Sequence, residues 1–205
     1  MKIRHILAIC AFFCISLSAS AQWYIGAKGG LSVSWIPGTS IYGYEKILPH
    51  NSFFAGAYGG VGIGDVAVLQ VEALYAGKGH SDRSIAELGG RYNRELAYLQ
   101  IPVFAGARIV DDRLTIMAGP EFGYLLFSKV KESDKAPVKN VNDCNRFNIA
   151  LGLQFNYMIT DWLGIDLKFD AGLNRTFSGD TIYKDMVDRG HNLSAQFGLC
   201  FRLDV

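Results

Sequence analysis

Residues 146–158 read RFNIALGLQFNYM, and apolar residues alternate there with polar or small ones. Phe147, Ile149 and Leu151 carry the apolar side of this alternation, while Asn148 and Gly152 belong to the other side. Because successive side chains of a β-strand point to opposite faces, a period of two over this length predicts a strand with one apolar and one polar face. The rest of the chain can be compared with this strand.

The same alternation recurs at 163–174 and at 192–203. Only residues 160–162 separate the first of these stretches from 146–158, so the two are expected to form a hairpin. Weaker alternation marks five more strands, at 24–34, 52–63, 66–77, 96–110 and 114–128. The sequence therefore predicts an all-β fold of eight strands.

The connections between these strands alternate in length. Short turns are expected at 64–65, 111–112 and 160–162, and long loops at 35–51, 78–95, 129–145 and 177–191. Short periplasmic turns and long outer loops are typical of outer-membrane barrels, and an even number of strands lets the sheet close without open edges. The predicted fold is an eight-stranded antiparallel up-and-down transmembrane β-barrel with short periplasmic turns and four longer outer loops.

A soluble barrel is the alternative fold. In a lipocalin-like barrel the faces would be inverted, and Phe147, Ile149 and Leu151 would point inward to a ligand. The many small residues on the polar face fit a crowded lumen better than a protein surface. We therefore expect the apolar face to contact lipid.

The N-terminus has the three parts of a secretory signal peptide. Lys2 and Arg4 precede an apolar run at 6–17, and small residues ending in Ala21 follow it. This run is shorter than the roughly 20 residues that a membrane-spanning helix needs. We expect residues 1–21 to be a cleaved signal peptide and residues 22–205 to form one barrel domain in the bacterial outer membrane.

Composition and charge agree with an exported β protein. Charged residues make up 19% of the chain, below the roughly 25% of ordinary soluble domains. Without Lys2 and Arg4, 18 basic residues remain against 19 acidic ones, a formal charge of −1. This near balance gives no sign of a nucleic-acid partner.

Aromatic residues are concentrated near the predicted strand ends. They are Trp23, Tyr24, Tyr157, Trp162 and Phe201 toward the periplasm, and Trp35, Tyr75, Phe127, Phe147 and Phe177 toward the outside. Two such levels resemble the interfacial girdles of membrane barrels, although aromatic residues of an ordinary core could also lie at strand ends.

Pro102 and Pro120 interrupt two of the predicted strands, because proline cannot donate to a β-ladder. Counted from the turn at 111–112, the two prolines lie nearly level with each other. We expect a bulge or a weakened ladder at this level.

Two short motifs point to a family. Residues 98–102 read YLQIP, and residues 118–126 read AGPEFGYLL. Strands with these inserted prolines resemble the PorT-like outer-membrane β-barrel family over essentially the whole predicted mature chain. The resemblance implies an outer-membrane location and an eight-stranded fold. It does not imply one activity, and we do not transfer the secretion role of the named member of that family.

The polar face of the predicted barrel carries five basic and four acidic residues. They are Lys28, Arg108, Arg146, Lys168 and Arg202, with Glu72, Glu121, Asp166 and Asp170. An eight-stranded barrel leaves a lumen that side chains can fill, so we expect a salt-bridged plug. Asp166 and Arg202 lie at similar heights on neighbouring strands and are predicted to pair. A proton or ion path is the alternative.

The sequence offers weak candidates for catalysis. The histidines at 50, 80 and 191 fall in predicted outer loops, where His80 precedes Ser81 and Asp82, and Ser194 follows His191. Neighbours in a loop do not establish a nucleophile, a base and an orienting acid, so the segment 80–82 is interpreted as a solvated turn. The sequence contains no phosphate-binding or dinucleotide-binding motif and no metal-ligand spacing, so no cofactor and no metal are expected.

Two cysteines remain after the predicted cleavage site. Cys144 precedes a strand at its outer end, and Cys200 lies near the periplasmic end of the last strand. A disulfide needs Cα atoms within about 7 Å, so we expect two free thiols, with Cys200 facing the lumen.

The predicted function is that of a non-enzymatic barrel, surrounded by outer-membrane lipid, that is structural or binds a partner through its outer loops. The loop 129–145 is rich in charge and is exposed in this fold. Lipopolysaccharide, a surface polysaccharide or another envelope protein are the expected partners. Three alternatives remain open, namely an accessory subunit of a secretion or uptake assembly, a lipid-modifying barrel enzyme, and a narrow pore.

Overall fold

The computed structural model describes residues 21–35, 47–82, 92–109, 113–132, 138–139, 144–176 and 191–205. The expected signal peptide, apart from Ala21, lies outside the described residues, as does Phe177. Within the described part, no helix is long and apolar enough to cross a membrane.

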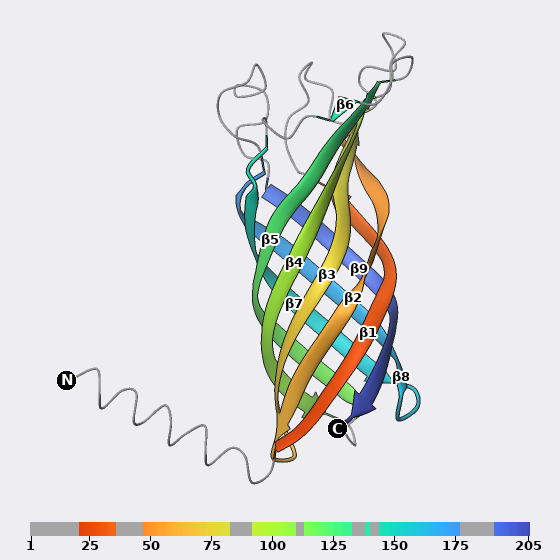
Figure 1. Cartoon of the computed structure of the whole chain (residues 1–205), viewed down its shortest axis with the longest axis vertical. Helices are drawn as coiled ribbons and strands as arrows, with labels where there is room; N and C mark the ends of the chain where they lie inside the picture. The colour runs from red at the N-terminus through yellow and green to blue at the C-terminus, as the bar shows by residue number, and fades with distance from the viewer. Residues whose placement is uncertain are drawn as a thin grey trace, which may run out of the picture.

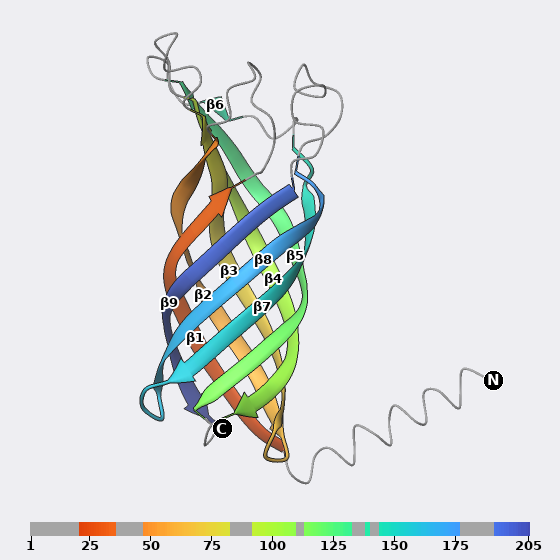
Figure 2. The ribbon, with the colours of Figure 1, turned by 180° about the vertical axis from the view of Figure 1, so that it is seen from behind.

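The strands are β1 (Ala21–Trp35), β2 (Ile47–Ile63), β3 (Ala67–Asp82), β4 (Tyr92–Ile109), β5 (Leu114–Glu132), β6 (Val138–Lys139), β7 (Phe147–Met158), β8 (Leu163–Arg175) and β9 (His191–Asp204). Strands that are neighbours in sequence pair in antiparallel fashion, except that β5 pairs both with the two-residue β6 and with β7. The first strand also pairs with the last, so the eight long strands close into a barrel (Figures 1 and 2). The predicted all-β antiparallel barrel is confirmed.

Alternation along each strand sorts the side chains into an outer and an inner set. On β7, Phe147 is 69% exposed and Leu151 is 54% exposed, whereas Ala150 and Gln154 are fully buried. The apolar face therefore points outward and the polar face points into the lumen. This arrangement rules out the inverted, lipocalin-like interpretation.

Two of the short turns are described and have the expected positions. Gly64 joins β2 to β3 with a φ of 59°, a left-handed conformation that glycine adopts without steric cost. Between β7 and β8, the backbone amides of Ile159 and Thr160 both donate to the carbonyl of Leu163, at 2.8 and 3.0 Å. The turn expected at 111–112 lies outside the described residues.

Four strands extend farther at their outer ends than the sequence predicted. The ends of β2, β3, β4 and β5 rise above those of β7, β8 and β9, so one wall of the barrel is taller (Figure 1). His80 to Asp82 belong to β3 and pair with residues 92–94 of β4, so the interpretation as a solvated turn was wrong. His50 and His191 also lie in strands, β2 and β9, rather than in loops. Above the lipid the outward face meets water instead of acyl chains, so polar residues occur on both faces of a strand and the period of two fades there.

The two prolines weaken the ladder without shifting it. The β4–β5 pairing stops at Pro102 opposite Glu121 and resumes three residues later in the same register. The β3–β4 pairing is interrupted at the same level. The expected weakened ladder is confirmed, but the bulge lies elsewhere, where Leu126 is the extra residue of β5 opposite the step from Ala97 to Tyr98.

Candidate functional site: the filled lumen

The lumen is built in layers, and the spacing of inward residues along the strands sets their order. On β5, Met117, Glu121 and Leu125 follow one another at intervals of four residues from the periplasmic end outward. Met117 belongs to a periplasmic apolar cluster with Tyr24, Tyr58, Val68, Phe104, Met158 and Cys200. Leu125 belongs to an outer apolar cluster with Leu96, Tyr98 and Cys144. The charged layer around Glu121 therefore lies between two apolar clusters.

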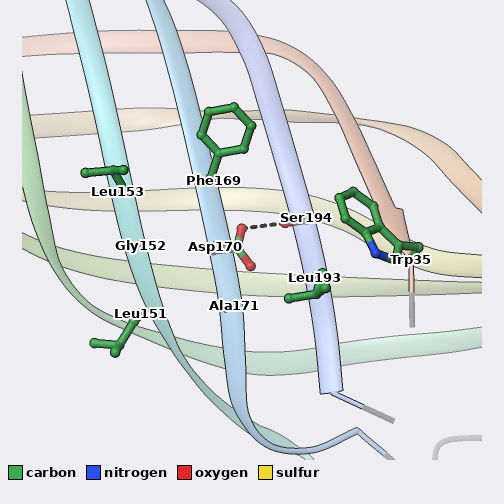
Figure 3. A pocket seen from close by; sticks show the side chains of 9 residues that line it. All are labelled: Trp35, Leu151, Gly152, Leu153, Phe169, Asp170, Ala171, Leu193 and Ser194. Atoms are coloured by element: carbon green, nitrogen blue, oxygen red, sulfur yellow. Dashed lines mark hydrogen bonds between the residues drawn. The ribbon is translucent and has the colours of Figure 1, made fainter. Parts of the chain in front are cut away.

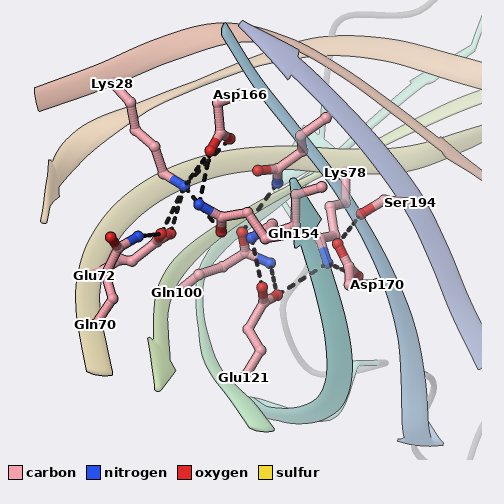
Figure 4. A network of polar contacts seen from close by, with 12 residues as sticks. Lys28, Gln70, Glu72, Lys78, Gln100, Glu121, Gln154, Asp166, Asp170 and Ser194 are labelled. Atoms are coloured by element: carbon pink, nitrogen blue, oxygen red, sulfur yellow. Dashed lines mark hydrogen bonds and ion pairs between the residues drawn. The ribbon is translucent and has the colours of Figure 1, made fainter. Parts of the chain in front are cut away.

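The periplasmic half of the charged layer is centred on Lys28 (Figure 4). Its Nζ lies 2.7 Å from both carboxylate oxygens of Glu72 and 3.3 Å from Oδ1 of Asp166. Gln154 accepts from Lys28 at 3.3 Å and donates to Asp166 at 2.7 Å, while Gln70 donates to Glu72 at 2.7 Å. Residues of four strands, β1, β3, β7 and β8, are thus joined across the lumen through one ammonium group.

The outer half of the layer is centred on Glu121. Its carboxylate lies 2.6 Å from Nζ of Lys168 and 3.5 Å from Nζ of Lys78, and it accepts a hydrogen bond from Gln100. Lys78 also lies 2.6 Å from Asp170, which in turn accepts from the hydroxyl of Ser194. These contacts connect β3, β4, β5, β8 and β9 (Figure 4).

The seven charged residues of this network are almost fully buried, and none is more than 4% exposed. Removing such charges from water costs several kcal/mol per ion, and the cost is recovered only when partners and further hydrogen bonds are well placed. Here the lysines alternate with carboxylates, and glutamines occupy further hydrogen-bonding positions. The network therefore fills the lumen and holds facing strands together.

Six of the nine predicted lumen residues come together in this network. They are Lys28, Glu72, Glu121, Asp166, Lys168 and Asp170. The three arginines do not join it.

Arg108 lies inside the barrel as predicted, whereas the predicted lumen positions of Arg146 and Arg202 need correction. Arg146 is exposed on the outer wall, where it donates to the hydroxyl of Tyr124 at 3.4 Å. Arg202 lies at the periplasmic rim, 4.5 Å from the ring centre of Tyr24 and paired with Asp204 at 2.7 Å. Arg108 is inside, but at the periplasmic end, where it donates to Gln22 at 3.2 Å.

The predicted pair of Asp166 and Arg202 is wrong. Asp166 lies opposite Gly198 in the β8–β9 ladder, and Arg202 is four residues farther toward the periplasm. Because barrel strands are tilted and staggered, residues at similar heights on neighbouring strands are not cross-strand partners. Asp166 contacts Lys28 across the lumen instead.

The sequence interpretation missed Lys78 and the buried glutamines Gln70, Gln100, Gln154 and Gln196. Lys78 was assigned to a loop because the predicted strand ended at 77. Its inward position could nevertheless have been predicted, since Lys78 continues the inward side of β3 after Glu72, Leu74 and Ala76.

Of the candidate catalytic residues whose side chains are described, His191 and Ser194 are not brought together. The two cysteines form no disulfide, as expected. His191 and Ser194 lie on opposite faces of β9; the histidine Nδ1 is 3.1 Å from the carbonyl oxygen of Gly172, and the serine hydroxyl donates to Asp170. Cys144 and Cys200 are both buried, one in each apolar cluster.

Comparisons with known proteins agree with this architecture. The family described as Outer membrane protein beta-barrel domain matches residues 18–178. No curated protein matches the chain. Among solved structures, the Ail protein of Yersinia pestis, determined with the heparin analogue sucrose octasulfate, is 11% identical with a TM-score of 0.51, over 89% of this chain and 99% of that one.

Two further solved barrels are similar at the same level. Neisserial surface protein A is 11% identical with a TM-score of 0.52, over 88% of this chain and 97% of that one. A major outer membrane protein of Thermus thermophilus is 12% identical with a TM-score of 0.50, over 89% and 99%. These likenesses show the fold alone. The family match covers most of the chain and shows that the chain belongs to the outer membrane protein β-barrel domain family, as a small bacterial outer-membrane barrel.

Proposed function

We propose that this barrel is a non-enzymatic scaffold that binds a partner at the cell surface through its outer end. The observation that carries the proposal is the network of seven charged residues in the lumen, which are paired, buried and enclosed between two apolar clusters. A lumen filled in this way supplies rigidity rather than a path for solutes. Recognition is then left to the parts of the molecule that extend beyond the lipid.

The taller wall supports this role for the outer end. Asn93 of β4 and Lys131 of β5 form a cross-strand pair near its rim, and both residues are exposed. Just below them, Lys129 lies 4.7 Å from the ring centre of Phe127. An anionic surface polysaccharide, lipopolysaccharide or another envelope protein would meet this wall first. In the alternative in which the barrel is an accessory subunit, the partner is a protein of a secretion or uptake assembly.

A photo-crosslinking experiment in whole cells tests the proposal. A photoreactive amino acid placed at Asn93 or Lys131 is expected to give a product of higher mass after illumination, and mass spectrometry would identify its partner class. Arg113, exposed beside the β4–β5 turn, serves as the matched periplasmic control. Crosslinks at Arg113 with none at the two outer positions would contradict binding at the outer end.

The filled lumen also predicts that the barrel does not conduct ions. Purified protein reconstituted into planar bilayers is expected to give no discrete conductance steps at moderate voltage, because the buried ion pairs occupy the lumen. Regular single-channel steps that depend on the protein would instead support the narrow-pore alternative.

A further inference from the structure

The charged network of the lumen contains one more carboxylate than it has ammonium groups. Its members are the lysines Lys28, Lys78 and Lys168 and the carboxylates Glu72, Glu121, Asp166 and Asp170. With every group in its ordinary charge state at neutral pH, three positive charges would face four negative ones. None of the seven residues is more than 4% exposed, so the extra negative charge would be buried inside the barrel.

The contact distances show which carboxylate is the extra one. Three carboxylates each have a lysine of their own at 2.6–2.7 Å, in the pairs Glu72–Lys28, Glu121–Lys168 and Asp170–Lys78. Asp166 lies 3.3 Å from Nζ of Lys28, and that ammonium group already contacts both oxygens of Glu72 at 2.7 Å (Figure 4). Asp166 is therefore the carboxylate whose charge the network neutralises least.

The groups around Asp166 do not supply the missing positive charge. Those that titrate, among the described residues, are Lys28 of β1, Tyr58 of β2, Glu72 of β3, Lys168 of β8 and Cys200 of β9. The two lysines are matched already, and the other three groups are neutral or anionic. Gln154 of β7 donates a hydrogen bond to Asp166 at 2.7 Å but carries no charge.

The buried and rim arginines have other partners. Arg202 pairs with Asp204 at 2.7 Å and Arg108 donates to Gln22 at 3.2 Å, both at the periplasmic end. Arg94 donates to Ser128 near the outer end of β4. These three arginines lie toward the ends of the barrel, away from Asp166.

The depth of Asp166 in the membrane also excludes a counter-ion from outside the wall. Asp166 lies opposite Gly198 in the β8–β9 ladder, and both neighbours of Gly198, Phe197 and Leu199, are exposed on the lipid face. Apolar clusters lie on both sides of the network along the lumen. An ionised carboxylate without its own counter-charge is strongly unfavourable in such surroundings, and a group in this position becomes neutral by binding a proton.

A small cavity lies between Asp166 and the periplasm. It has a volume of about 10 Å³, and its polar lining includes Tyr24, Tyr58, Gln70, Asn156 and Arg202. This volume is enough for about one water molecule, and the hydroxyl and amide groups of the lining can hydrogen-bond to it. Asn156 is the cross-strand partner of Asp166, while Arg202 is at the periplasmic rim. A water molecule here would let Asp166 exchange a proton with the periplasm.

We propose that Asp166 is a proton-binding site, and that the folded barrel holds one proton on its carboxyl group at neutral pH. The bound proton makes the lumen network electrically neutral. The proton is held and not conducted, because the outer apolar cluster separates the network from the outer end. This inference goes beyond the proposed function and does not depend on what the outer end binds.

Infrared spectroscopy of the purified barrel in an alkyl maltoside, a detergent without carbonyl groups, tests the proposal. A protonated carboxyl group has a carbonyl stretch that an ionised carboxylate lacks. The parent is expected to show this band at neutral pH, and Asp166→Asn is expected to lose it. Asparagine keeps the size and the neutral charge of a protonated aspartate, so the variant should fold. If the parent shows no such band, the proposal is overturned without any variant.

Asp170 supplies the matched control, because it is the same residue type on the inward side of the same strand. Its carboxylate lies 2.6 Å from Lys78 and accepts from the hydroxyl of Ser194 (Figure 3). Asp170→Asn should keep the band but lower the urea midpoint of unfolding, whereas Asp166→Asn should lose the band and keep the midpoint. Loss of the band in Asp170→Asn or Glu72→Gln, with its retention in Asp166→Asn, would overturn the assignment to Asp166.

The pH dependence of unfolding gives a second, quantitative test. The pKa of an aspartate in an unfolded chain is about 3.9, so above that pH unfolding of the parent would release the proton of Asp166. The stabilisation by this proton is fully present below that pH and is lost as the pH rises. Relative to Asp166→Asn, the unfolding equilibrium constant of the parent should therefore rise about tenfold per pH unit between about pH 5 and pH 7. A constant ratio of the two equilibrium constants over this range would overturn the proposal.

Discussion

Replacing Lys168 with methionine is expected to lower the free energy of unfolding by about 3–5 kcal/mol, the usual cost of breaking a buried ion pair by removing one partner. Lys168 is fully buried, and its Nζ lies 2.6 Å from Glu121. Methionine fills a similar volume but cannot neutralise the carboxylate. Glu121 would keep only the longer contact of 3.5 Å to Lys78 among its cationic partners in the described network. Equilibrium unfolding in urea, followed by tryptophan fluorescence and gel mobility, measures the change.

A lysine outside the lumen supplies the control. Lys129→Met removes the same charge from a half-exposed site at the outer end of β5, where a loss within about 1 kcal/mol is expected. The double variant Lys168→Met/Glu121→Gln should recover part of the lost stability, since it also removes the unpaired carboxylate. A loss for Lys168→Met as small as that for Lys129→Met would show that the lumen is hydrated and that the pair is weak.

Most of the fold could be predicted because the bilayer imposes one rule on every strand that crosses it. In 146–158 the outward positions must be apolar, so residues such as Ile149 and Leu151 mark the outer face directly. The same rule does not apply above the lipid. The outer ends of β3 and β4 were therefore assigned to a loop, and β6, with two residues, is too short to show any period.

The lumen was harder to predict than the fold because its contacts cross the barrel. Lys28 contacts Asp166, which is far from it in the sequence, and no local spacing of residues predicts this contact. Charge alone identified most of the residues. Their pairing depends on strand tilt and stagger, which place Arg202 away from Asp166. It also depends on where the strands end, because Lys78 was left out of the predicted lumen when the predicted strand ended at residue 77.

The lumen network and the lipid-facing wall follow from the same alternation and place opposite demands on adjacent residues. Gln196 is buried in the lumen, while its neighbour Phe197 is 56% exposed toward lipid. A polar group is therefore accepted at one position when it is hydrogen-bonded, and is excluded at the next because acyl chains offer no partner. Neighbouring positions on one strand can thus test which face meets lipid.

Phe197→Arg is accordingly expected to cost about 2–4 kcal/mol, the range for an arginine on the lipid face of a barrel at the bilayer midplane. Phe197 lies midway between Phe201, which stacks on Trp162 at a centroid distance of 6.1 Å, and Leu193, which pairs with Trp35. These two aromatic levels bracket the membrane, so Phe197 is near its centre. Unfolding of the barrel in lipid vesicles gives the measurement.

Leu203→Arg, on the same face of β9 near the periplasmic boundary, should cost only about 0–1 kcal/mol. If both arginines cost the same, depth along β9 would have no effect, and the aromatic residues would not mark the membrane boundaries. If Phe197→Arg were harmless, this face would meet water rather than lipid.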